Sequence, residues 1–158
     1  MGKLLERLQD SSRSGVYRAG SDVAILEATR GSRLDVVPIE LTADVFGAIA
    51  RALNFPEWFG GNWDALEDCL SDLSWRKAGG SVLIFRNFEA LDQDQLGILI
   101  DVLASSAEFW AGRGKPFFAV FIDPERKLSL PELFRGSRPS SCRYRCWWWC
   151  IPPISRCC

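Results

Sequence analysis

The sequence has 158 residues, of which 47% are hydrophobic and 25% charged, and its formal net charge is −1. A chain of this length and composition is expected to fold as one soluble globular domain with its own core. It contains no histidine. This excludes Ser–His and Cys–His dyads, His-ligated zinc and acid–base catalysis by imidazole.

The charges are distributed unequally along the chain. Of the 19 basic residues, five lie in 135–158, which has no acidic residue, so residues 1–134 carry 14 basic and all 20 acidic side chains. An acidic body of this kind is expected to avoid nucleic acid. The apolar runs are shorter than a signal-peptide core or the roughly 20 residues of a membrane span, so we expect no membrane partner.

Cysteine usage indicates a reducing compartment. Five of the six cysteines lie within 135–158, and Cys69 alone lies in the body of the chain. A disulfide therefore cannot form within the body of one chain, which is typical of proteins kept in a reducing environment. We expect a cytoplasmic protein.

The spacing of apolar residues predicts alternating helices and strands. Residues 1–22 mix charged residues with serine and glycine, which predicts a loose N-terminal segment with a short extended piece at Val16–Tyr17. Beyond this segment we expect, in chain order, a helix at 23–29, a strand at 34–41, helices at 45–53 and 63–73, a strand at 81–85, a helix at about 92–110 and a strand at 117–122. This order predicts an α/β fold with a small parallel sheet and right-handed crossovers.

Residues 55–73 carry five carboxylates and no lysine or arginine. Asp64, Asp68 and Asp72 stand four residues apart, so on a helix they form one negative face. Like charges at this spacing destabilise an isolated helix by about 0.2–0.5 kcal/mol per pair. A helix face that is simply solvated usually mixes both signs. We therefore expect this face to bind something positively charged.

Aromatic residues lie directly before this helix. Trp58 and Phe59 follow Pro56, and two adjacent aromatic side chains at such a place cannot easily both point into the core. Gly60 and Gly61 allow a tight turn, and Asn62 is a good N-cap for the helix.

The sixteen residues from Phe55 to Leu70, FPEWFGGNWDALEDCL, resemble the signature of the barstar family, the intracellular inhibitors of barnase-type ribonucleases. The pattern is long and ungapped, and weaker similarity through VLIFRNFEAL and FFAVFI extends it over about 34–123. The resemblance implies a barstar-like α/β fold, with a three-stranded parallel sheet flanked by helices.

The resemblance also implies a function. In this family the loop and the following helix fill the ribonuclease active site, and Asp68 matches the aspartate whose carboxylate replaces a substrate phosphate. The implied protein is a monomeric inhibitor, an immunity protein or antitoxin, that binds a basic secreted or toxin-type ribonuclease and has no catalytic residue, metal ligand or cofactor. The implied partner-binding residues are Trp58, Phe59, Gly60, Asn62, Trp63, Asp64, Glu67, Asp68 and Asp72. Two positions depart from the family: Glu67 stands at an aromatic contact position, and Trp58 replaces a more usual tyrosine.

Other functions remain open from the sequence. The same acidic surface would serve a regulatory or adaptor module that binds another basic protein. Asp64 and Asp68 could ligate Mg²⁺, although the chain has no phosphate-binding glycine loop. Cys69 could act as a nucleophile, but it has no histidine or adjacent cation to lower its pKa.

The C-terminal residues 135–158 differ in composition from the rest, with five cysteines and three consecutive tryptophans. Their cysteine spacing does not match zinc-finger pairs, and the aromatic patch could touch a membrane surface. We interpret this segment as a disordered or non-native extension that derives from another reading frame. The expected division is therefore a loose segment at 1–22, a barstar-like domain at 23–134 and a tail at 135–158.

Overall fold

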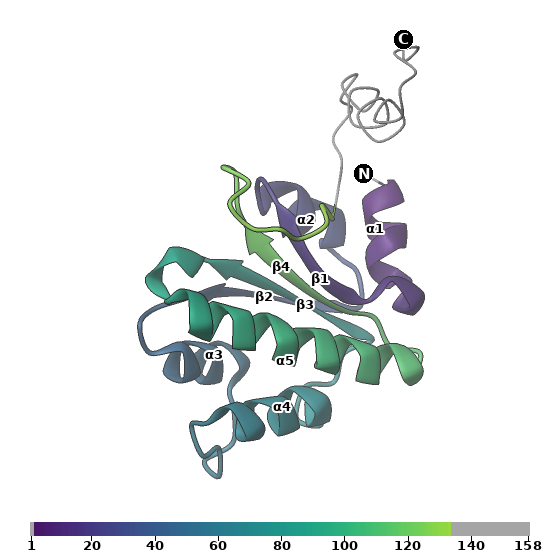
Figure 1. Ribbon diagram of the computed structural model, residues 1–158. Helices are drawn as coiled ribbons and strands as arrows, with labels where there is room; N and C mark the ends of the chain where they lie inside the picture. Colours follow the sequence, from purple (N-terminus) through teal and green to yellow (C-terminus); the bar gives the residue numbers. More distant parts are fainter. Residues whose placement is uncertain (1, 134–158) are drawn as a thin grey trace, which may run out of the picture.

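A four-stranded parallel sheet forms the centre of the molecule (Figure 1). The structure is a computed structural model, and it describes residues 2–133. The elements in chain order are α1 (Gly2–Gln9), η1 (Ser11–Arg13), β1 (Gly15–Ala19), α2 (Val23–Thr29), β2 (Leu34–Glu40), α3 (Val45–Leu53), α4 (Trp63–Asp72), β3 (Gly80–Arg86), η2 (Phe88–Ala90), α5 (Gln93–Gly112) and β4 (Phe117–Ile122). The α/β prediction is confirmed.

The sheet has one strand more than the predicted three. Its order is β1-β4-β3-β2, and β1 pairs with β4 in a parallel register from Gly15↔Phe118 to Ala19↔Ile122. On the other side of β1, the amide of Arg18 donates to the carbonyl of Pro131 and the amide of Leu133 donates to the carbonyl of Arg18. The extended piece predicted at Val16–Tyr17 lies within β1, but its pairing in the sheet was not predicted, because β1 is held by partners about 100 residues away in the sequence.

The prediction of a loose segment at 1–22 is wrong, because this segment contains α1, η1 and β1. The first helix buries Leu4 and Leu8, which lie four residues apart and therefore on one helix face. A helix of two turns is marginal by itself, so tertiary packing supplies its stability.

The strands bury side chains on both faces, and each face has its own helices (Figure 1). Leu83 and Phe85 of β3 pack on the side of α3, α4 and α5, whereas Val82 and Ile84 pack on the side of α1 and α2. The alternation follows from the two-residue period of a strand. Helix α4 therefore lies on the α3–α5 side, with α5 beside it.

Candidate functional site

Helix α4 presents its acidic residues on one exposed face. Its opposite face buries Leu66, Cys69 and Leu70 in the core. Asp64, Asp68 and Asp72 are exposed, as the four-residue spacing predicts. None of the ion pairs formed within residues 2–133 involves a carboxylate of α4. The negative charge of this face is therefore not neutralised inside the described part of the chain.

The start of α4 is fixed by a local cap. Asn62 has an extended backbone, and its Oδ1 accepts a hydrogen bond of 2.7 Å from the amide of Ala65. Gly61 before it has a φ of +67°, which favours glycine. The predicted N-cap is confirmed.

The Asn62→Ala substitution is expected to lower the free energy of unfolding by about 1 kcal/mol, because the amide at the start of α4 loses its acceptor. Urea denaturation followed by circular dichroism measures this change. Asn62→Asp is the control, since aspartate caps equally well. An alanine variant as stable as the parent would contradict the role of the cap.

The aromatic residues in the loop before α4 and at its first position comprise one exposed and three half-buried side chains. Trp58 is 61% exposed. The Phe59 ring packs on Phe55, with centroids 4.9 Å apart, and Trp63 packs on Phe46 of α3, with centroids 4.8 Å apart. Trp58 and Phe59 thus point in different directions, as expected for adjacent residues. Phe46 thus supports the Trp63 ring from α3. The sequence pattern of 55–73 did not indicate this contact.

Two side-chain hydrogen bonds join α4 to α5. Glu67 accepts a hydrogen bond of 2.5 Å from the hydroxyl of Ser105, and Trp110 Nε1 donates to the carbonyl of Leu70 at 2.8 Å. Ser105 and Trp110 were not among the predicted site residues, because they lie about 40 residues further along the chain. Glu67 is therefore engaged within the protein, unlike the three exposed aspartates.

The environment of Cys69 opposes nucleophilic chemistry. Burial raises the pKa of the Cys69 thiol, and the negative charges of Asp68 and Asp72 raise it further. A reactive thiolate needs the opposite environment, with a cation or a helix N-terminus nearby. Cys69 is a core residue of α4.

Within residues 2–133, no group of three or more Cys, Asp or Glu side chains could hold a metal ion. Among the helices of the same residues, none has the length and apolarity to cross a membrane. The cysteines and tryptophans of 135–158 lie outside the described residues.

More than half of the chain matches a known protein family. The model of the family described as Barstar (barnase inhibitor) matches residues 31–122. The match begins just before β2, ends with β4 and includes the whole of 55–73. No curated protein matches the chain.

Proposed function

The chain belongs to the barstar family, and from this premise we propose that it binds a barnase-type ribonuclease and occludes its active site. The observation that carries the proposal is the exposed face of α4, with three aspartates and no cation paired to them within residues 2–133. An active site that binds RNA phosphates offers the matching positive charges.

Asp68 lies in the middle of this face and is the proposed centre of the contact. A carboxylate held among guanidinium and ammonium groups forms short, charge-assisted and often bidentate hydrogen bonds. These are the bonds that the same enzyme groups would form with a phosphate. Asp64 and Asp72 lie one helical turn before and after Asp68 and extend the negative surface.

Trp58 supplies the apolar part of the proposed contact. It is the most exposed large hydrophobic residue in the described part of the chain, and it stands in the loop just before the acidic helix. Tryptophan and arginine are the residues most enriched among those that dominate binding energy at interfaces. An apolar ring beside a carboxylate face fits a site that holds both a base and a phosphate.

In the proposed function the protein is a non-enzymatic, monomeric inhibitor without a cofactor. It would act in the cytoplasm as an immunity protein or antitoxin, protecting a cell from its own ribonuclease or from one received from outside. The loop and helix that carry the contact are supported by the cap of Asn62, the hydrogen bond of Glu67 and the packing of Phe59 and Trp63 described above. Gly60 lies exposed in the same loop and belongs to the proposed contact surface.

The association rate with a barnase-type ribonuclease is expected to fall steeply with salt. Clustered charge accelerates the encounter with an oppositely charged partner, and the Debye length falls from about 30 Å at 0.01 M to about 3 Å at 1 M ionic strength. Stopped-flow fluorescence over this range measures the rate. A salt-independent rate would contradict electrostatic recognition by α4.

A further inference from the structure

The two ends of the proposed partner-binding segment meet at one carbonyl group. The carbonyl of Leu53, at the end of α3, accepts a hydrogen bond of 3.1 Å from Trp75 Nε1 and one of 3.2 Å from Arg76 Nη1. Arg76 Nε also donates to Asp35 Oδ2 of the edge strand β2. We call these three hydrogen bonds the Leu53 clamp. Between Leu53 and Trp75 lie the loop with Trp58 and the whole of α4.

The clamp is built from groups that need partners. The last carbonyls of a helix lack N–H donors within the helix, and α3 ends at Asn54 in the left-handed conformation, with a φ of 53°. Arginine suits this place because its planar fork donates in two directions at once. The side chains of Arg76 and Asp35 are only 18% and 23% exposed, so their ion pair is screened less than a surface pair.

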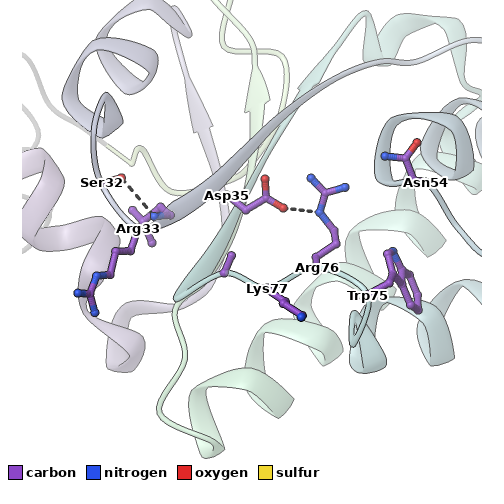
Figure 2. A pocket seen from close by; sticks show the side chains of 9 residues that line it. Ser32, Arg33, Asp35, Asn54, Trp75, Arg76 and Lys77 are labelled. Carbon is purple, nitrogen blue, oxygen red and sulfur yellow. Dashed lines mark hydrogen bonds and ion pairs between the residues drawn. The ribbon is translucent and has the colours of Figure 1, made fainter.

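Asp35, Trp75 and Arg76 line an open crevice of about 470 Å³. Figure 2 shows how their side chains lie. The guanidinium of Arg76 is turned toward Asp35, whereas the neighbouring Lys77 points away from the pair. Lys77 is exposed and takes part in none of the ion pairs of residues 2–133. The two adjacent cations thus have different roles.

Aromatic packing connects the clamp with the exposed tryptophan. The Trp75 ring meets Phe55 edge to face at a centroid distance of 5.9 Å, and Phe55 meets Phe59 in the same way at 4.9 Å. The amide of Phe59 donates to the carbonyl of Pro56, which closes the turn that carries Trp58. A shift at Leu53 or Trp75 would therefore move the loop that presents Trp58.

We propose that Arg76, through the Leu53 clamp, is a positioning residue that holds the Trp58 loop and α4 in their binding arrangement before a partner arrives. The inference rests on the proposed function for its partner, but the clamp itself concerns the free protein. Ordering a loop upon binding reduces affinity, so a loop that is ordered beforehand binds more tightly. Arg76 needs no contact with the partner for this effect.

Substitutions that change the net charge in known directions distinguish an effect of the clamp from an effect of charge on binding. Arg76→Ala and Lys77→Ala each make the chain more negative by one charge, which favours encounter with a basic ribonuclease. Of these two substitutions, only Arg76→Ala removes hydrogen bonds of the Leu53 clamp. The complex of Arg76→Ala should therefore dissociate about tenfold faster than that of the parent, whereas the complex of Lys77→Ala should dissociate at the parent's rate. Asp35→Asn changes the charge in the opposite direction and should also speed dissociation. It serves as the second variant if Arg76→Ala does not fold.

The experiment combines two measurements on the full chain. Surface plasmon resonance with an immobilised barnase-type ribonuclease gives the association and dissociation rates of the parent, Arg76→Ala, Asp35→Asn and Lys77→Ala. Hydrogen exchange of the free proteins gives the protection of the Phe55 and Phe59 amides, with the amides of β3 and β4 as the internal reference. We expect faster dissociation and faster exchange in the first two variants, and neither in Lys77→Ala.

The two proposals fail in different ways. If the parent chain does not bind the ribonuclease, the proposed function is wrong, and the exchange of the free proteins still decides the clamp. If Arg76→Ala and Asp35→Asn match Lys77→Ala in the exchange of the Phe55 and Phe59 amides, Arg76 does not position this loop. Equal dissociation rates in the three variants would likewise overturn the proposal.

Discussion

Replacing Asp68 with alanine is expected to weaken binding to a barnase-type ribonuclease by about 2–5 kcal/mol. The carboxylate is exposed in the free protein, and no ion pair within residues 2–133 involves it. Its removal therefore has little effect on the free chain. In the complex it would leave the enzyme's cations buried without a counter-charge, which is the costly situation. Isothermal titration calorimetry of parent and variant measures the loss.

Two control variants distinguish the contribution of the Asp68 carboxylate to binding from the effects of side-chain shape and of net charge. Asp68→Asn retains the shape of the side chain but removes its charge, so it should lose most of the same binding energy. Glu27→Ala removes one negative charge from α2, which packs on the opposite face of the sheet, and Glu27 is exposed. It should bind within a few tenths of a kcal/mol of the parent. Equal losses in Asp68→Ala and Glu27→Ala would show that only net charge matters.

Replacing Leu8 with alanine is expected to destabilise the fold by about 2–5 kcal/mol. Leu8 is fully buried in the cluster that also contains Val82, Ile84, Phe118 and Val120 of the central strands. Alanine would leave a cavity between α1 and this face of the sheet. Urea denaturation gives the change as a lower midpoint with an unchanged slope.

Leu5→Ala is the matched control for the same helix. Leu5 is only half-buried, so the substitution has the same effect on helix propensity but removes less packing, and its destabilisation should be clearly smaller. If Leu8→Ala unfolds at the same urea concentration as the parent, α1 is not part of the cooperative unit. The large effect is expected because residues 1–22 are not a loose segment but contain α1, which packs on the sheet.

The acidic helix could be predicted because its features depend on residues close together in the sequence. Asn62 caps α4 through its own side chain, and the buried positions of Leu66 and Leu70 follow from helical spacing within a few residues. The helix also departs from local rules, because Asp72 lies in its last turn, where no basic residue opposes the negative end of the helix dipole. Such a departure is expected where function outweighs stability.

Contacts between distant parts of the chain could not be predicted in this way. Strand β1 exists because it pairs with β4, and the Ser14 hydroxyl accepts a hydrogen bond from the amide of Phe117 at the start of that strand. The bond between Glu67 and Ser105 and the clamp on Leu53 also join residues 20 or more positions apart. Periodicity shows which residues face a core, but it does not show which distant residue they meet.

The measurement that tests the central claim most directly is a ribonuclease inhibition assay. Cleavage of a fluorogenic RNA by a barnase-type ribonuclease is followed while the purified protein is added up to a molar excess. We expect activity to fall to zero near an equimolar ratio, and the Asp68→Ala variant to require a large excess. Undiminished cleavage in the presence of excess parent protein would contradict the proposed function.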